Sequence, residues 1–326
     1  MSAPLAVIAL GGNAISPARS EGNIAEQFAA SRATAVRLAD VIQSGVRVVI
    51  THGNGPQVGN VLRRVELAAH EVYILPLDTC VADTQGGMGY MIAQCLNNEL
   101  RRRGDARRIS TIITSVEVDR DDPAFAHPTK PIGRTYSRQR AEQHTRAHGW
   151  HSTETAPGEF RRVVPSPRPL QIVEIDLIAE MARAGHVVIA CGGGGIPVIR
   201  SEQGDWLGVE AVIDKDRTSS LLAQRIDADA LVIATEVAGV ALDFGKPTQR
   251  WLDRLTPAEA RRLLESGQFP AGSMGPKVEA AAEFVERSRR PAARALICHL
   301  DHIGDALAGR AGTIVERDTG IEGLRD

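Results

Sequence analysis

The sequence predicts an α/β protein built on a mainly parallel sheet that helices cover. Of its 326 residues, 43% are hydrophobic but only 4% are aromatic, so the core must consist mostly of Val, Ile, Leu and Ala. That is the composition of a parallel sheet buried on both faces. Several times along the chain, a short apolar run is followed by a glycine loop and then by a helical pattern. This order predicts parallel strands joined by right-handed crossovers.

The N-terminal part of the chain shows this order first. We expect strands at residues 5–10, 46–51 and 109–116. Helices are expected at residues 24–43, at residues 57–70 and over a third stretch that ends near residue 103. Asn23 is a suitable N-cap for the first helix, and Gly45 is placed to end it.

The same order resumes in the C-terminal half. Residues 198–210 are expected to form a hairpin around Gly204 and Asp205. Thr256 followed by Glu259 has the spacing of a capping box and predicts the start of a helix. Further strands are expected at residues 186–191, 230–237, 294–300 and 313–316. Further helices are expected at residues 174–184 and 278–288, and a third is expected to follow Asp216 and to end near residue 226.

Between these halves, residues 118–165 break the order. The segment is polar, contains five prolines and has no long apolar run. We interpret it as an inserted lid subdomain within one domain that covers residues 1–326. His144, His148 and His151 lie in this insert and could indicate a metal, but no carboxylate or cysteine completes a site. A solvated polar face is the simpler interpretation of these histidines.

Composition excludes several classes of protein. The net charge of −2 gives no global field that would favour nucleic acid or a membrane surface as a partner. No apolar stretch approaches the ~20 residues that a membrane span needs. The four cysteines are far apart and lack metal-ligand spacing, so we expect them to be reduced core residues of a cytoplasmic protein.

Three glycine loops are predicted to meet at one edge of the sheet. They contain Gly11 to Asn13, Gly53 to Gly55 and Gly192 to Gly195, and each follows a predicted strand. Ligands of open α/β sheets bind outside the carboxyl ends of the strands. Glycines there allow backbone N–H groups to form an anion nest, although a glycine can also serve the turn alone. The loops match neither a Walker A motif nor a dinucleotide fingerprint, and there is no serine-hydrolase elbow.

A fourth loop, Gly272 to Lys277, has the features of a phosphate site. Its glycines allow close approach of a ligand to the backbone, and Pro276 suits the first turn of a helix. The helix N-terminus and Lys277 would both attract an anion. An ordinary loop that starts a helix is the alternative interpretation.

Lysine is rare in this chain, since only Lys130, Lys215, Lys246 and Lys277 occur among many arginines. A compact ammonium group can follow a phosphoryl group as it moves, whereas a rigid guanidinium does so less well. We interpret Asp216 as the residue that fixes the neighbouring lysines. A charged helix start, with Asp216 as a simple N-cap, is the alternative, and so is a chance surface position for each lysine.

Seven motifs, taken together and in order, resemble those of the carbamate kinases in the amino-acid-kinase superfamily. They cover nearly the whole chain, and Leu10 stands where acetylglutamate, aspartate and UMP kinases usually carry a lysine. The motifs are Ala9 to Ala14, Thr51 to Gly59, Lys130 to Gly133, Arg161 to Pro167, Ala190 to Pro197, Gly208 to Asp216 and Gly272 to Lys277.

This resemblance implies a three-layer αβα sandwich around a mainly parallel open sheet, with a protruding subdomain, in a homodimer. The implied reaction is reversible phosphoryl transfer between ATP and carbamate, which gives ADP and carbamoyl phosphate. Mg²⁺ is expected to accompany ATP or ADP. Asp214 is interpreted as facing the nucleotide or the metal, and no protein side chain is assigned as a metal ligand. The resemblance further implies that the reaction runs toward ATP synthesis in the catabolism of arginine or ureido compounds.

Roles for individual residues also follow from matching the motifs. Lys215 and Lys277 would bind the moving phosphoryl group, Asp216 would organise them, and Lys130 would reach in from the insert. The substrate and phosphate site would consist of Gly11, Gly12, Asn13, Gly53, Asn54, Gly193 and Gly194. The nucleotide would be bound by Asp214, Thr235, Val237, Phe244, Gly272, Ser273, Met274, Gly275 and Lys277.

Two other functions remain open at the level of the sequence. One is a kinase of the same fold that acts on another small carboxylate or phosphate. The other is a relative that binds nucleotide without catalysis, as a sensor or assembly subunit. The presence of Asp216 and of the three motif lysines favours an enzyme.

Overall fold

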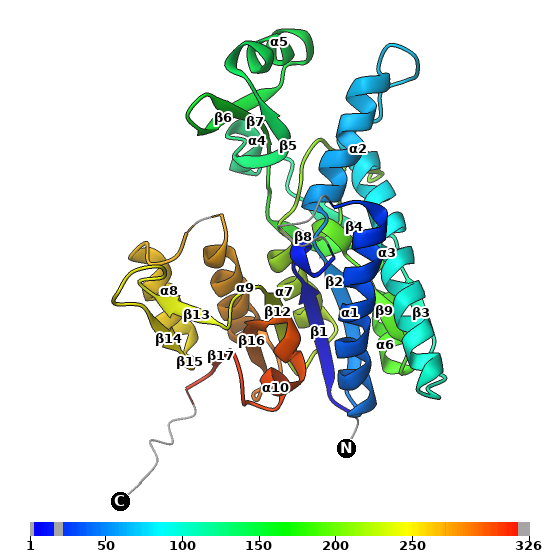
Figure 1. The fold of residues 1–326 in the computed structure, drawn as a ribbon, viewed down its shortest axis with the longest axis vertical. Coiled ribbons are helices and arrows are strands. Elements are labelled where there is room, and N and C mark those ends of the chain that lie inside the picture. Colours follow the sequence, from blue (N-terminus) through cyan, green and yellow to red (C-terminus); the bar gives the residue numbers. More distant parts are fainter. Residues whose placement is uncertain (1–2, 16–21, 271, 319–326) are drawn as a thin grey trace, which may run out of the picture.

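A computed structural model describes residues 3–15, 22–270 and 272–318 (Figure 1). Its centre is an eight-stranded sheet with the order β15-β17-β16-β12-β1-β2-β9-β3. All neighbouring strands are parallel except β16 and β17, which are antiparallel. The strands are β1 (Leu5–Leu10), β2 (Arg47–His52), β3 (Ile109–Thr111), β9 (Val187–Ile189), β12 (Ala230–Thr235), β15 (Arg254–Leu255), β16 (Arg294–His299) and β17 (Thr313–Glu316).

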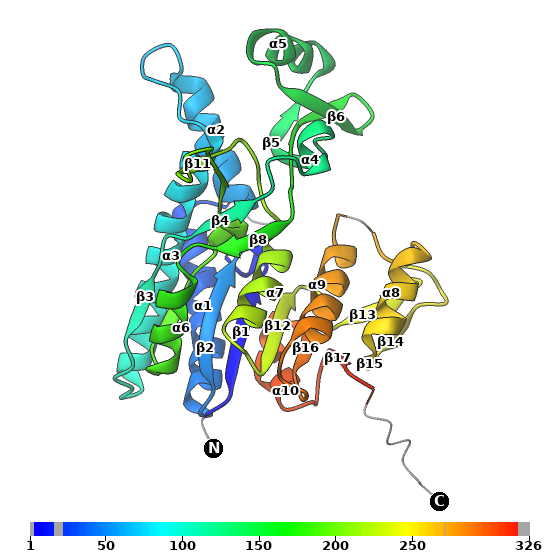
Figure 2. The same cartoon turned by 180° about the vertical axis from the view of Figure 1, so that it is seen from behind.

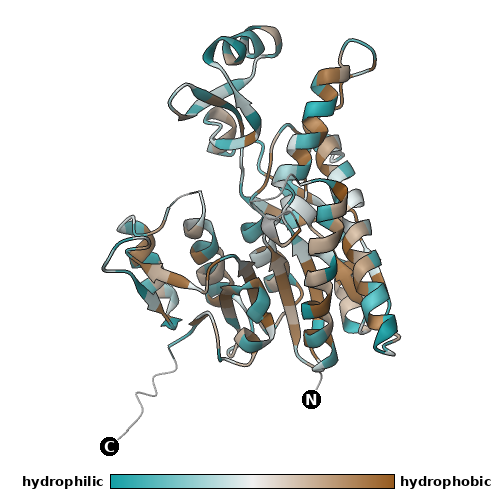
Figure 3. Cartoon of the chain, in the orientation of Figure 1, coloured by the Kyte–Doolittle hydropathy of each residue, from teal (hydrophilic) through white to brown (hydrophobic). Residues whose placement is uncertain are grey.

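Helices cover both faces of this sheet, as Figures 1 and 2 show from opposite sides. Val7 and Ala9 of β1 pack toward one helical layer, while Ala6 and Ile8 pack toward the other. The first layer contains α6 (Ile175–Arg183), α7 (Lys215–Arg225), α8 (Pro257–Glu265) and α9 (Met274–Arg287), and the second contains α1 (Ile24–Gln43), α3 (Leu77–Arg102) and α10 (Ile303–Leu307). The predicted three-layer αβα sandwich is therefore confirmed, and hydrophobic residues concentrate in its central strands (Figure 3).

Local sequence signals predicted several helix ends correctly. Asn23 caps α1 in a capping box with Glu26, and Thr256 caps α8 in a second box with Glu259. The hairpin expected at residues 198–210 is also present, as β10 (Ile196–Arg200) paired with β11 (Trp206–Gly208). α2 (Gly55–Ala68) begins two residues before its expected start.

One expected strand was wrong. Residues 109–116 form two strands, β3 and β4 (Ser115–Val118), which belong to different sheets. Gln85 of α3 causes the break, because its side chain accepts from the backbone N–H of Thr114 (2.8 Å) and donates to the carbonyl of Thr114 (3.0 Å). The N–H of Thr114 is thus used by a side chain and not by a strand, while its carbonyl also accepts from the N–H of Ile196 in β10 (2.9 Å). β4 then joins β8 (Pro169–Ile172), β10 and β11 in a four-stranded sheet.

The insert, residues 118–165, extends away from the sandwich (Figure 1). Its three strands have the order β5-β7-β6 and form a sheet of their own. Hydrophilic residues predominate on its outer helix, α5 (Figure 3). The elements are α4 (Pro123–Ala126), β5 (Lys130–Tyr136), α5 (Arg138–His148), β6 (His151–Ala156) and β7 (Glu159–Val164).

One of the three histidines of the insert differs from the solvated face that was expected. His148 and His151 are exposed, as a solvated face requires, but the ring of His144 is half-buried and stacks on Trp150 at 4.5 Å. Burial lowers the pKa of His144. Among the residues the structure describes, no three His, Cys, Asp or Glu side chains gather as a metal site would require.

Two other expectations concern the core and the surface. All four cysteines are buried and unpaired, which confirms that they are core thiols. Within the described ranges, no helix combines the length and the apolar character that crossing a bilayer demands.

His52, at the end of β2, is a buried titratable group in this core. Its Nδ1 donates to the carbonyl oxygen of Gly53 (3.1 Å), and a Cβ on Gly192 would lie 2.5 Å from its Nε2. Burial, aided by the charge of Lys215, lowers the pKa of His52 to about 4. The folded protein therefore holds this imidazole neutral near pH 7.

We predict that His52 makes the fold sensitive to mild acid. In the unfolded chain His52 takes up a proton near pH 6.5, but in the folded chain only near pH 4. The contribution of neutral His52 to the free energy of unfolding is therefore complete above pH 6.5 and is lost as the pH falls toward 4. Between pH 7 and 5, the free energy of unfolding of the wild type should drop by about 2 kcal/mol more than that of His52→Asn. Urea unfolding at both pH values measures this, with the exposed His70→Asn as control. Equal losses in the wild type and His52→Asn would contradict the prediction.

Candidate active site

The loops after β1 and β2 touch at the carboxyl edge of the sheet. The backbone N–H of Gly53 donates to the carbonyl oxygen of Leu10 (3.0 Å). A Cβ on Gly53 would lie 3.2 Å from the backbone nitrogen of Gly12 and 3.8 Å from the Cδ of Lys215. A larger side chain at Gly53 would therefore fill the space between these loops and the lysine. Asn13 lies in a short 3-10 helix, Gly12–Ala14, and its side chain is outside the described part of the chain.

The third glycine loop packs against the second. Gly193 and Gly194 have φ values of 67° and 97°, which glycine adopts without strain. A Cβ on Gly193 would lie 2.2 Å from the side-chain nitrogen of Asn54, and a Cβ on Gly194 would lie 2.4 Å from the carbonyl oxygen of Ile213. The loop therefore bridges the second loop and the start of α7, and any side chain at Gly193 or Gly194 would displace that contact.

Asp214 is the N-cap of α7. Its Oδ1 accepts from the backbone N–H groups of Asp216 (2.9 Å) and Arg217 (3.4 Å). The alternative in which Asp216 is the cap is therefore wrong. The other oxygen of Asp214 accepts from Nζ of Lys130 at 3.2 Å. This ion pair brings a lysine of the insert to the carboxyl edge of the main sheet.

Asp216 lies between two lysines. Its Oδ1 accepts from Nζ of Lys215 (2.6 Å) and its Oδ2 from Nζ of Lys277 on α9 (2.9 Å). The three side chains are only 5%, 11% and 18% exposed, for Asp216, Lys215 and Lys277 respectively. Burial alone would raise the pKa of Asp216, but the two ammonium groups outweigh it and lower this pKa. The carboxylate is therefore ionised at neutral pH.

The two lysines respond differently to this setting. Burial and the nearby Lys277 lower the pKa of Lys215, although Asp216 opposes that shift. For Lys277 burial acts in the same direction, but Asp216 and Asp214 outweigh it and raise the pKa. We call Lys130, Lys215, Lys277, Asp214 and Asp216 the lysine cluster. Its three ammonium groups against two carboxylates leave one net positive charge, and each ammonium group has N–H donors beyond the one directed at an aspartate.

The loop before α9 offers fewer free backbone N–H groups to an anion than its sequence suggests. The helix begins at Met274, four residues before its expected start, and Pro276 lies in its first turn. The N–H groups of Ser273 and Gly275 both donate to the carbonyl oxygen of Pro270, at 3.2 and 3.0 Å. These amides are thus engaged within the chain. Gly272 is exposed in the turn before the helix.

The residues expected to bind the nucleotide base lie on the β12 side of the cluster. Thr235 ends β12, and Val237 follows in the loop to β13 (Val240–Leu242). Phe244 is 61% exposed and contacts the ring of Trp251 in β14 (Arg250–Leu252) edge to face, with centroids 6.3 Å apart. Within the described residues, no hydrogen bond or ion pair joins Thr235, Val237 or Phe244 to the lysine cluster.

Two hydroxyl residues of α7 belong to the site although the sequence did not reveal them. Ser219 lies 2.6 Å from the hydroxyl of Thr51 in β2 and donates to the carbonyl of Lys215 (2.7 Å). Thr218 donates to the carbonyl of Gly194 (2.8 Å). Both are fully buried. A signal was available, because polar residues one helical turn after Lys215 face the same loops as that lysine.

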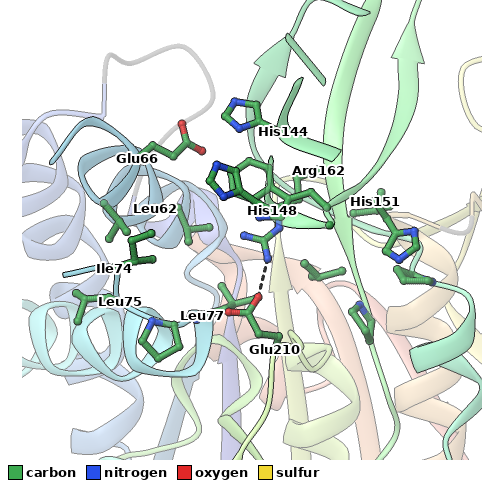
Figure 4. A pocket seen from close by; sticks show the side chains of 18 of the residues that line it. Leu62, Glu66, Ile74, Leu75, Leu77, His144, His148, His151, Arg162 and Glu210 are labelled. Carbon is green, nitrogen blue, oxygen red and sulfur yellow. Dashed lines mark hydrogen bonds and ion pairs between the residues drawn. The ribbon is translucent and has the colours of Figure 1, made fainter. Parts of the chain in front are cut away.

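A cavity of about 650 Å³ lies apart from the lysine cluster, between the insert and the helices α2 and α3 (Figure 4). Leu62, Leu75 and Leu77 form an apolar wall, and Trp150 and Arg162 of the insert face it. None of the three cluster lysines lines this cavity.

Comparison with known proteins identifies the class. The model of the amino acid kinase family matches residues 4–293. A carbamate kinase of Thermococcus kodakarensis is 47% identical over 316 residues, which are 96% of this chain and 99% of that protein. The carbamate kinase-like protein YahI of Escherichia coli is 45% identical over 95% of this chain and 98% of its own length. A structure of carbamate kinase from Giardia lamblia bound to AMP-PNP superposes with a TM-score of 0.91 at 38% identity, covering 97% of this chain and 99% of that one.

The chain belongs to the amino acid kinase family, and these relatives are carbamate kinases and a carbamate kinase-like protein. It is an ATP-dependent kinase, and the resemblance found in the seven motifs is confirmed.

We predict that Lys215→Ala lowers kcat by on the order of 10² or more while KM changes little, because a charge that follows the phosphoryl group acts mainly in the transition state. Asp216→Asn should act in the same direction, since both lysines lose their shared anchor. Steady-state kinetics with both substrates measures these effects. A near-normal kcat in both variants would contradict this role for the cluster.

Proposed function

We propose that the protein is a carbamate kinase that transfers a phosphoryl group reversibly between ATP and carbamate, giving ADP and carbamoyl phosphate. One observation carries the proposal. Three of the chain's four lysines, from the insert, α7 and α9, converge on Asp214 and Asp216 beside Gly53. Phosphoryl transfer depends chiefly on positioning and on neutralising charge, and these lysines supply both.

Each part of the site has a task in this proposal. Lys215 and Lys277 hold the oxygens of the transferring phosphoryl group, and Asp216 keeps the two ammonium groups apart and oriented. Lys130 approaches from the insert, so that the group is contacted from both sides. The loops at Gly11–Gly12, Gly53–Asn54 and Gly193–Gly194 present backbone in place of side chains, which suits a substrate as small as carbamate.

Mg²⁺ fits this site as a companion of the nucleotide. Mg²⁺ in kinases is commonly held by substrate phosphates, by water and by one or two carboxylates. Both oxygens of Asp216 are occupied by lysines, and those of Asp214 by Lys130 and the start of α7. Asp214 is the more exposed of the two carboxylates, at 23%, and is the one that could face the ion. The metal would offset charge on the nucleotide phosphates.

The comparisons support the reaction but leave an alternative acceptor open. The relative from Thermococcus kodakarensis is named a carbamate kinase, whereas YahI, with 45% identity, is named only carbamate kinase-like. A kinase that acts on another small carboxylate or phosphate therefore remains the second candidate.

Further parts of the proposal rest on the chemistry and the family. Carbamoyl phosphate is a reactive mixed anhydride, so we infer that the cellular reaction runs toward ATP, in the breakdown of arginine or ureido compounds. We further infer a cytoplasmic homodimer in which residues 118–165 act as a lid. Light scattering after size-exclusion chromatography tests the dimer.

The deciding experiment couples ATP formation from carbamoyl phosphate and ADP to a reporter reaction, with a panel of small carboxylates and phosphates tested with ATP in parallel. ATP formed from carbamoyl phosphate supports the proposal. Turnover only with another acceptor supports the second candidate. Nucleotide binding without any turnover would indicate a non-catalytic relative.

We predict that Lys130→Ala lowers kcat by on the order of 10², the usual loss for one contact to transition-state charge, while ADP affinity stays nearly constant. The reason is that Lys130 comes from the insert, whereas the residues expected to bind the base, Thr235, Val237 and Phe244, lie on the β12 side of the cluster. Stopped-flow turnover and calorimetric ADP binding separate the two effects. Lys246→Ala is the matched control, since this lysine is 66% exposed and pairs with Asp243 on the surface. A normal kcat in Lys130→Ala would exclude the lid function of this lysine.

Lys277→Ala should weaken ADP binding and lower turnover together. The side chain lies in the first turn of α9, and it contacts the same carboxylate as Lys215. Its loss removes a charge next to the predicted phosphate position in both the ground state and the transition state. ADP affinity and turnover should therefore each fall by about tenfold or more. Calorimetry and kinetics on one preparation test this, and unchanged affinity would show that the loop does not bind nucleotide.

A further inference from the structure

Two lines of contact between the insert and the sandwich lie on either side of the cavity described above. Along the first, β5 lies on α2: a Cβ on Gly59 would be 3.3 Å from Cα of Gly133, and Tyr136 donates to Glu66 (2.5 Å). Along the second, β7 faces the chain that leads into α7. The cavity of Figure 4 lies between these two lines. The end of β7 next to the sandwich is packed, because Val164 is buried in one apolar cluster with Leu77 and Val212. A polar interaction adds to this packing.

That interaction is an ion pair between Arg162 and Glu210, drawn as a dashed line in Figure 4. Arg162 of β7 donates to Oε2 of Glu210 at 2.6 Å, and its side chain is only 13% exposed. The guanidinium group also lies 4.4 Å from the centre of the Trp150 ring. Arginine suits this position because its planar group can stack on a ring and bond a carboxylate at the same time.

Glu210 also anchors the pair to the rigid part of the molecule. Its Oε1 accepts from the backbone N–H of Leu77 (3.0 Å), the first residue of α3. A carboxylate is favoured at a helix N-terminus, where N–H groups are unpaired and the dipole is positive. One side chain thus joins the insert to the 26-residue helix α3.

The same chain segment also receives Lys130. Four residues after Glu210, Asp214 accepts from Nζ of Lys130, and between them the N–H of Val212 donates to the carbonyl of Pro165 (3.0 Å). Within the insert, Lys130 pairs with Val164, two residues from Arg162. The contacts therefore close a ring that runs from Arg162 through Glu210 and Asp214 to Lys130 and back along β7.

We propose that Arg162 and Glu210 are positioning residues for Lys130, an inference that rests on the proposed phosphoryl transfer. The pair at Lys130 and Asp214 is a single contact between partly exposed side chains, at 29% and 23%, and such a contact holds a geometry weakly. Glu210 is more exposed, at 54%, but the N–H of Leu77 and the ring of Trp150 also constrain its pair with Arg162. With the second contact in place, β5 and β7 keep the register in which Lys130 reaches the cluster. Without it, the insert turns about its contact with α2, and Lys130 occupies the reactive position for a smaller fraction of the time.

The test uses Glu210→Gln, which removes the charge that binds Arg162 and keeps an oxygen that accepts from Leu77. We expect kcat for ATP formation to fall on the order of tenfold, with unchanged ADP affinity, because a misplacement near 1 Å has effects of up to 10². In a Lys130→Ala background the same substitution should cause no further loss, since it acts through Lys130. Glu286→Gln, which alters the surface pair with Arg261, is the matched control.

Amide hydrogen exchange gives a readout that does not depend on turnover. In Glu210→Gln, residues 130–136 and 159–164 should exchange faster than in the wild type, while α9 exchanges as before. Unchanged exchange in the insert would overturn the inference, and so would an equal loss of kcat with and without Lys130. A wild-type protein that forms no ATP would instead refute the proposed function, and the exchange result would still decide whether the pair holds the insert.

Discussion

The site depends on one buried carboxylate shared by two lysines. Two ammonium groups this close, and this shielded from water, would repel each other and lose protons, which would destroy their value for binding phosphate. Asp216 removes this conflict because each of its oxygens takes one lysine, and its own pKa is lowered in return. The surrounding elements serve this arrangement. α7 places Asp216 at the edge of the sheet, α9 brings Lys277, and the hydroxyl groups of Thr51 and Ser219 tie α7 to β2.

The glycine loops add a second constraint, which concerns space. At Gly53, Gly193 and Gly194, a side chain would meet the backbone or an amide of the neighbouring loop. The loops thus lie closer together than loops with ordinary side chains could. The site they form is bounded by peptide groups, and within the described part of the chain Lys130, Lys215 and Lys277 bring their ammonium groups to its edge. Such a site favours a small anion and leaves little room for a bulky acceptor.

The sequence predicted the parts of this molecule that depend on nearby residues. The caps of α1 and α8 were readable because Asn23 with Glu26, and Thr256 with Glu259, act within one helical turn. The break at Thr114 was not, since its cause is Gln85 on a distant helix. Asp214 and Asp216 have the same chemistry and stand two residues apart, so only the backbone direction could show which one caps α7. The motifs identified the candidate lysines. The contact of Lys130 with Asp214 could not be predicted, because it forms only when the insert is folded against the sandwich.

The three tryptophans of the chain lie outside the main sheet. Trp150 stacks under Arg162 in the insert, Trp206 under Arg200 in the hairpin of β10 and β11, and Trp251 beside Phe244 in the two-stranded sheet of β13 and β14. Intrinsic fluorescence therefore reports on three peripheral modules and not on the central core. Single-tryptophan versions of the protein would give each module its own optical signal, so that movement of the insert could be followed separately from events on the nucleotide side.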